Sequence, residues 1–128
     1  LLRTRQSAEI LRRKLNLNKI HFSNKILEVK SSLQGQPLIY LIKSIFDIFP
    51  SSKNKIAGET VEDVSKRMED FIKKITILHR GKRIAVVSHG DPIMVVKAKK
   101  KGIPITFKSI RPYRKDYIKQ GEIYLLTI

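Results

Sequence analysis

The sequence predicts an α/β fold in which helices cover a mostly parallel sheet. Segments with apolar residues three or four positions apart, typical of helices, alternate with short apolar segments typical of strands. One such segment, Ile84–Val87, is apolar at every position, as in strands buried on both faces of a parallel sheet. The chain has 128 residues, 41% hydrophobic and 30% charged, which fits one globular domain over residues 1–128.

The N-terminal half is expected to hold two helices separated by an extended segment. Apolar or small residues at helical spacing indicate a helix from Leu1 to Leu15, and Asn16 to Asn18 end it. Ile26–Val29 is predicted to be a short strand or extended stretch. Leu38–Phe49 is apolar on nearly every side and predicts a buried helix that Pro50 stops.

The best-marked helix is predicted to begin at Thr60. Asp63 follows three residues later, which is the spacing of a capping box. Gly81 offers the left-handed conformation that ends a helix. The expected inward stripe consists of Val61, Val64, Met68, Phe71, Ile75 and Leu78.

Another helix is predicted directly after the strand Ile84–Val87. Asp91 has the residue type of a helix cap and Pro92 that of a first helical residue. This helix is expected to run to about Lys101. Glu122–Ile128 then forms the last predicted strand.

The chain is strongly basic, with 27 Lys and Arg against 11 Asp and Glu and a net charge of +16. A nucleic acid or an acidic lipid is one explanation. The lysines are scattered instead of forming a stripe, so the sequence favours compositional drift over a nucleic-acid partner. The strongest basic feature with interleaved aromatic residues comprises Lys97, Lys99, Lys100, Lys101, Arg111, Tyr113, Arg114 and Tyr117.

Other compositional features narrow the class of protein. No apolar run reaches the ~20 residues of a membrane-spanning helix. Cysteine is absent, which fits a reducing compartment, and a cytoplasmic location is expected. No dense cluster of His, Asp and Glu is present. No cofactor is expected.

The segment that carries most chemistry is Val86–Ile93. His89 leaves the carboxyl end of the predicted strand, where ligands of open α/β sheets bind. Gly90 permits close backbone approach, and the helix N-terminus offers N–H groups to an anion. His89 is therefore a candidate phosphate ligand or proton-transfer group. The alternative is a histidine that only packs at the end of the strand.

Two further side chains are candidates for the same chemistry. Arg3 lies in the first turn of a helix, where a guanidinium can make two parallel bonds to a phosphate. Glu28 follows an apolar pair, where partial burial would raise the pKa of the carboxyl and make it a general acid. A solvated arginine and a surface glutamate are the alternatives. Glu59 and Asp91 are lesser acid candidates, with roles at helix starts favoured for both.

Four motifs together resemble the histidine phosphatase superfamily, with its phosphoglycerate-mutase-like fold. Leu2–Ala8 resembles all but the beginning of the arginine motif Ser-x-Leu-x-Arg-x-x-Gln-Thr-Ala. Ile26–Gly35 resembles the Leu-x-Glu segment with a later glycine. Gly58–Thr60 with Arg67 resembles the Gly-Glu-Ser/Thr opening of a long helix, and Val87–Gly90 lies in the Val-x-Ser-His-Gly motif. The resemblance implies a three-layer α/β/α fold.

The chain departs from the family pattern at the nucleophile. The family's nucleophilic histidine lies in an Arg-His-Gly motif on a first strand, and no Arg-His-Gly occurs here. His21 and His79 lie in other contexts and are expected to be solvated. We expect the chain to be N-terminally truncated, with the first strand and helix missing and the nucleophile upstream.

The resemblance implies a phosphatase that hydrolyses a small phosphomonoester through a phosphohistidine, without a metal. Arg3, His89 and Gly90 would bind the phosphate, and Glu28 would protonate the leaving oxygen. This fragment alone is expected to be inactive. Two alternatives remain: a mutase of the phosphoglycerate type, and a non-catalytic basic domain that binds nucleic acid or phosphate. The sequence does not indicate an oligomeric state.

Overall fold

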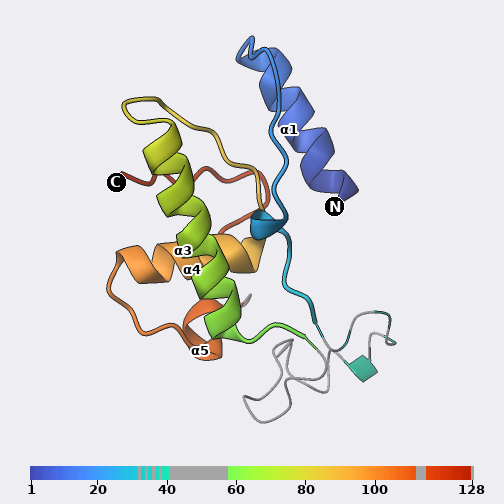
Figure 1. Cartoon of the computed structure of the whole chain (residues 1–128). Helices are drawn as coiled ribbons and strands as arrows, with labels where there is room; N and C mark the ends of the chain where they lie inside the picture. The colour runs from blue at the N-terminus through green and yellow to red at the C-terminus, as the bar shows by residue number, and fades with distance from the viewer. Residues whose placement is uncertain are drawn as a thin grey trace.

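The computed structural model describes residues 1–31, 33, 35, 37, 39–40, 58–111 and 115–127. Within this part the chain forms four α-helices and one 3₁₀ helix (Figure 1). They are α1 (Leu2–Lys14), η1 (Asn24–Ile26), α3 (Val61–Leu78), α4 (Gly90–Lys100) and α5 (Phe107–Ile110).

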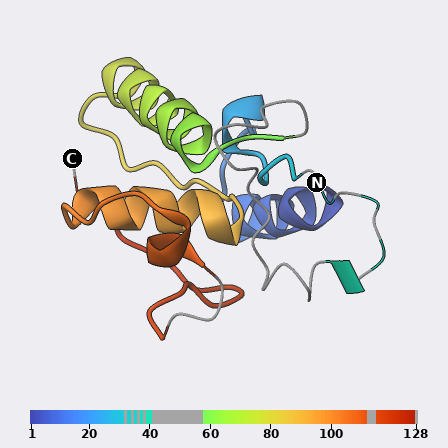
Figure 2. The same ribbon diagram turned by 90° about the horizontal axis from the view of Figure 1, so that it is seen from below.

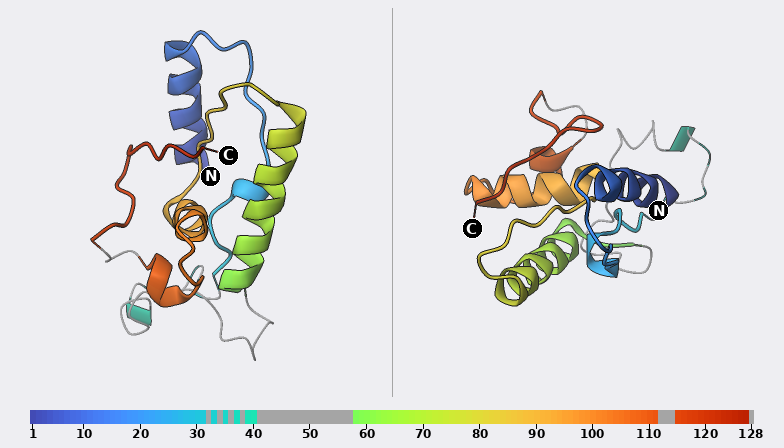
Figure 3. Two further views of the ribbon diagram at one scale, coloured as in Figure 1. Left: turned by 90° about the vertical axis from the view of Figure 1, so that its left-hand side faces the viewer. Right: turned by 90° about the horizontal axis from the view of Figure 1, so that it is seen from above.

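The first helix, α1, forms where the apolar spacing predicts it. It ends at Leu15, and Asn16 takes the left-handed conformation with a φ of 52°. Of the apolar or small residues at helical spacing, Thr4, Ala8 and Leu11 are half-buried, whereas Leu1 and Leu15 are 49% and 52% exposed. No residue of α1 is fully buried. Accordingly, α1 stands to one side of α3 in Figures 1 and 3.

The helix α3 confirms the predicted capping box. The Thr60 hydroxyl accepts the N–H of Asp63 at 3.1 Å, and the Asp63 carboxylate accepts the N–H of Thr60 at 3.0 Å. After the helix, Gly81 has a φ of 72°, as expected for a left-handed stop. Only the first half of the predicted inward stripe is buried, and Leu78 is 62% exposed.

The core lies where α3 and α4 cross, with η1 against α3 and α5 against α4 (Figures 2 and 3). Its apolar residues come from both crossing helices, from the segment after η1 and from the C-terminal part of the chain. They are Val29, Val61, Val64, Met68, Met94, Val95, Ala98, Ile110 and Ile118.

The described residues contain no strand, so the predicted parallel sheet is not formed among them. Ile84–Val87 and residues 122–127 run without helix or strand assignment. Ile84 and Val86 are 43% and 41% exposed, so the prediction that this segment is buried on both faces is wrong. A strand is buried in a sheet by neighbouring strands and covering layers. Here a cavity of about 400 Å³ lies beside the segment, bordered also by α1, residues 17–27 and the second half of α3.

Two further segments of the N-terminal half had been predicted. Ile26–Val29 was expected to be a short strand or extended stretch. In the structure Ile26 ends the 3₁₀ helix η1, and an irregular segment follows it. The predicted buried helix over Leu38–Phe49 lies almost entirely outside the described residues. Ile39 and Tyr40, which are described, are helical but about half exposed.

Candidate phosphate site

Three side chains from distant parts of the chain meet at the start of α4. Arg3 comes from the first turn of α1, Glu28 from the segment after η1, and His89 is the N-cap of α4. The Arg3 Nη2 lies 3.2 Å from the His89 Nδ1 and 3.5 Å from the Glu28 Oε2, across 86 positions of sequence between Arg3 and His89. The Glu28 Oε2 lies 3.3 Å from the same His89 nitrogen. The structure thus brings together the three candidates that the sequence identified.

His89 is held as a neutral imidazole. His89 is only 6% exposed. Burial, followed by the positive charges of Arg3, of the N-terminal ammonium group and of Arg67, lowers the pKa of His89 to about 4. The Arg3 guanidinium has only donors, so the His89 Nδ1 accepts from it. The ring proton of the neutral form then lies on Nε2. Such an N–H can donate a hydrogen bond.

The pKa of Glu28 shifts in the opposite direction from that of His89. Burial raises the pKa of Glu28, the hydrogen bond from the Val29 N–H lowers it, and the negative charge of Asp91 raises it again. Arg3 and Arg67 also lower this pKa, but less. With a raised pKa, Glu28 holds its proton to a higher pH than an ordinary glutamate. Such a carboxyl is suited to giving a proton to a leaving oxygen.

The start of α4 differs from the prediction. The helix begins at Gly90 with His89 as N-cap, and Asp91 is its second residue. The prediction of Asp91 as the cap is therefore wrong. Its carboxylate is buried and accepts a hydrogen bond from the Tyr117 hydroxyl at 2.9 Å instead. Since the partner lies 26 positions away, no local signal in the sequence shows this contact.

The geometry suits binding of a phosphate group. The first N–H groups of an α-helix have no partner within the helix and attract anions, and Gly90 opens α4. The Arg3 side chain stays 67% exposed, so a ligand can reach its guanidinium. Together with the His89 N–H, these groups offer donors from two helix starts to one anion.

A partly buried ion pair, whose pairing the sequence did not predict, anchors the Glu28 segment. Arg67 on α3 binds Glu59 through two nitrogens at 2.7 and 3.1 Å, and its Nη1 donates to the carbonyl of Lys25 at 2.7 Å. The N–H of Lys30 donates to the Glu59 carboxylate at 3.0 Å. The prediction favoured a role for Glu59 as an acid at the start of a helix. Instead, Glu59 precedes the N-cap Thr60 and binds Arg67. It ties the segment with Glu28 to α3.

Removing this anchor should destabilise the protein and loosen Glu28. The side chains of Arg67 and Glu59 are 14% and 19% exposed, so Arg67→Ala leaves a largely buried carboxylate without its partner. We expect a loss of about 3 kcal/mol in the free energy of unfolding, as for one partner of a buried pair. Urea unfolding measures it. Arg13→Ala, which breaks an exposed pair with Glu9, is the control and should change stability far less. Equal losses in the two variants would contradict the anchor.

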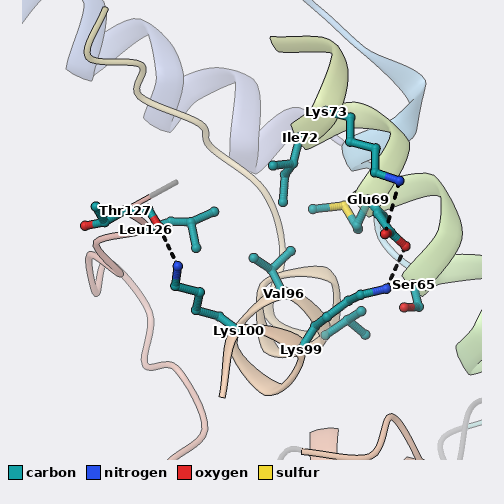
Figure 4. A pocket seen from close by; sticks show the side chains of 11 residues that line it. Ser65, Glu69, Ile72, Lys73, Val96, Lys99, Lys100, Leu126 and Thr127 are labelled. Carbon is teal, nitrogen blue, oxygen red and sulfur yellow. Dashed lines mark hydrogen bonds and ion pairs between the residues drawn. The ribbon is translucent and has the colours of Figure 1, made fainter. Parts of the chain in front are cut away.

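Other parts of the described structure lack such a convergence. A cavity of about 250 Å³ between α3, α4 and residues 126–127 is lined mainly by apolar groups (Figure 4). At its rim Glu69 binds Lys73 and Lys99, and Lys100 donates to the Thr127 carbonyl. Among the described residues, no group of three or more His, Cys, Asp or Glu is placed to hold a metal ion. No helix in this part is long and apolar enough to cross a membrane. His21 and His79 are exposed, as predicted.

Comparison with known protein families identifies the family of the chain. Residues 1–114 match the family described as the histidine phosphatase superfamily, branch 1. Searches among curated proteins and among solved structures gave no significant match. The matched range contains Arg3, Glu28 and His89, whereas Tyr117 lies beyond it. The chain therefore belongs to the histidine phosphatase superfamily, branch 1.

Proposed function

We propose that the protein is a phosphatase that hydrolyses a small phosphomonoester through a phosphohistidine intermediate. The observation that carries this proposal is the meeting of Arg3, Glu28 and His89 at the start of α4. Arg3, the His89 Nε2–H and the Gly90 N–H bind the phosphate oxygens, where charge gathers during transfer. Glu28 holds the proton that the leaving group needs.

The proposed nucleophile is a histidine outside the 128 residues, in the Arg-His-Gly motif of the family. His21 and His79 are exposed, and the His89 Nδ1 is already bonded to Arg3. The cavity of about 400 Å³ beside Ile84–Val87 extends to His89 and is lined by apolar and charged side chains together. Its apolar part suits a strand that carries the motif. We propose that this strand pairs with Ile84–Val87 and so also starts the parallel sheet of a three-layer α/β/α domain.

The proposed reaction has two steps. The histidine nitrogen attacks the phosphorus, the P–O bond to the substrate breaks, and the leaving oxygen takes the proton of Glu28. Glu28, now a carboxylate, then accepts a proton from water as the water oxygen attacks phosphohistidine. The P–N bond breaks, inorganic phosphate leaves, and both histidine and Glu28 return to their starting forms.

The basic character of the chain does not by itself favour nucleic-acid binding. Three of the lysines from the strongest basic feature have partners within the protein. Lys97 donates to the Asp116 carbonyl at 2.7 Å, Lys99 binds Glu69 at 2.6 Å, and Lys100 donates to the Thr127 carbonyl at 2.6 Å. Tyr113 and Arg114 lie outside the described residues. The hydroxyl of Tyr117 is bonded to Asp91.

The test is an assay of the protein with its Arg-His-Gly segment on an aryl phosphate. A phosphatase releases one inorganic phosphate for each phenol. A mutase instead passes the phosphoryl group to a second hydroxyl compound, so that free phosphate falls short of the phenol released. Turnover with stoichiometric phosphate, lost when the histidine of the motif is replaced by alanine, supports the proposal. Absence of turnover on any phosphomonoester would contradict it.

A further inference from the structure

A tyrosine outside the family match contacts the helix start that bears the site. Tyr117 lies in the described segment 115–127, beyond residues 1–114. Its hydroxyl donates to the Asp91 Oδ1 at 2.9 Å. Its ring lies so close to Gly90 that a methyl group on that glycine would collide with the hydroxyl. Tyr117 thus touches the two residues that directly follow His89.

The Tyr117 hydrogen bond favours the charged form of Asp91. The residue is 6% exposed, and none of the Lys and Arg side chains in the described part of the chain forms an ion pair with it. Burial raises the pKa of Asp91, and the Tyr117 hydrogen bond opposes that rise. Tyr117 remains an uncharged donor because burial and the adjacent carboxylates raise its own pKa.

The negative charge of Asp91 acts on the carboxyl of Glu28. The charged and titratable groups that face Glu28 are Arg3 on α1, Arg67 on α3, His89 before α4, Asp91 on α4 and Tyr117. Of these, the negative charge of Asp91 favours a protonated Glu28, and the two arginines favour its carboxylate. When two carboxyls repel each other, ionisation of one favours the protonated form of the other.

We propose that Tyr117 is a positioning residue that acts through Asp91 and favours the protonated form of Glu28. The Tyr117 hydroxyl stabilises the carboxylate form of Asp91, and the negative charge of that carboxylate favours a protonated Glu28. Without the hydroxyl, the buried Asp91 is protonated more readily and its charge no longer supports the proton of Glu28. This inference rests on the proposed function in one respect only, namely that Glu28 gives its proton to the leaving oxygen.

The test is a ¹³C NMR titration of the side-chain carboxyls of Glu28 and Asp91 in the 128-residue chain. In Tyr117→Phe the ring still packs on Gly90, but the donor to Asp91 is lost. We expect the midpoint of Asp91 to rise and that of Glu28 to fall, by about one pH unit for a charge-assisted hydrogen bond. Asp91→Asn should also lower the Glu28 midpoint. When Asp91→Asn is already present, adding Tyr117→Phe should have no further effect on it.

Tyr124→Phe is the matched control. The Tyr124 ring lies near Lys97 and its hydroxyl is not bonded to Asp91, so both midpoints should stay in place. Unchanged midpoints in Tyr117→Phe, or equal changes in the two tyrosine variants, would overturn the inference. A Glu28 midpoint that Asp91→Asn leaves unchanged would overturn it as well.

Kinetics separate this inference from the proposed function. If Glu28 is the acid, the rate falls as the pH rises through its pKa, and Tyr117→Phe moves this fall to lower pH. In Tyr117→Phe, the titration midpoints of Asp91 and Glu28 could move while the pH profile of the rate stays in place. That result would support the role of Tyr117 but refute Glu28 as the acid.

Discussion

His89→Ala and Arg3→Ala should each reduce kcat by about 10²–10³-fold in the protein that carries its Arg-His-Gly segment. Each change removes a donor aimed at the charge that develops on the phosphoryl oxygens, and one oxyanion donor is worth about that much. Because the Arg3 Nη2 lies 3.2 Å from the His89 Nδ1 and both side chains are proposed to serve one phosphoryl group, the double variant should lose less than the product of the single losses. Steady-state kinetics of the three variants on an aryl phosphate measure this.

The matched control is Arg13→Ala on the same helix as Arg3. Arg13 binds Glu9 at 2.9 Å and its side chain is 74% exposed, away from His89. Its removal should leave kcat nearly unchanged. An equal loss in Arg13→Ala and Arg3→Ala, or full turnover by His89→Ala, would show that the phosphate site lies elsewhere.

The 128-residue chain alone should have no measurable phosphatase activity. Its three histidines are His89, which we propose as a neutral phosphate ligand, and the exposed His21 and His79. Without an attacking histidine the covalent step does not occur. The measurement is the aryl phosphate assay on the purified chain beside the protein with the Arg-His-Gly segment. Activity of the short chain that survives purification and disappears in His89→Ala would refute an upstream nucleophile.

The sequence predicted the helices α1, α3 and α4 because their signals are local. Caps, helical spacing and a terminal glycine all act within a few residues, and the Thr60–Asp63 capping box is present as expected. The start of α4 was misplaced because Asp91 has the residue type of a cap, while its side chain turns to Tyr117. Residue type fixes what a side chain can bond, and the tertiary structure decides which partner it meets.

The sequence allowed the side chains of the candidate site to be predicted, but not the contacts that hold them in place. Arg3, Glu28 and His89 could be singled out because each stands at the end of an element and matches a family motif. The Arg67–Glu59 anchor and the Tyr117–Asp91 contact join segments whose spacing carries no periodic signal. The sheet was predicted from the apolar run Ile84–Val87, but a strand also requires a neighbouring backbone, which the run itself does not provide.

The identity of the phosphorylated residue is the most direct test of the proposed reaction. The protein with its Arg-His-Gly segment is mixed with a ³²P-labelled phosphomonoester, quenched in alkali, and mapped by peptide sequencing. We expect a phosphoryl group on the histidine of the Arg-His-Gly motif, stable in alkali and lost in acid, with none on His21, His79 or His89. It should persist longer in Glu28→Gln, which lacks the base for the water step. Label on His89 or on a serine, or turnover without any phosphohistidine, would contradict the account.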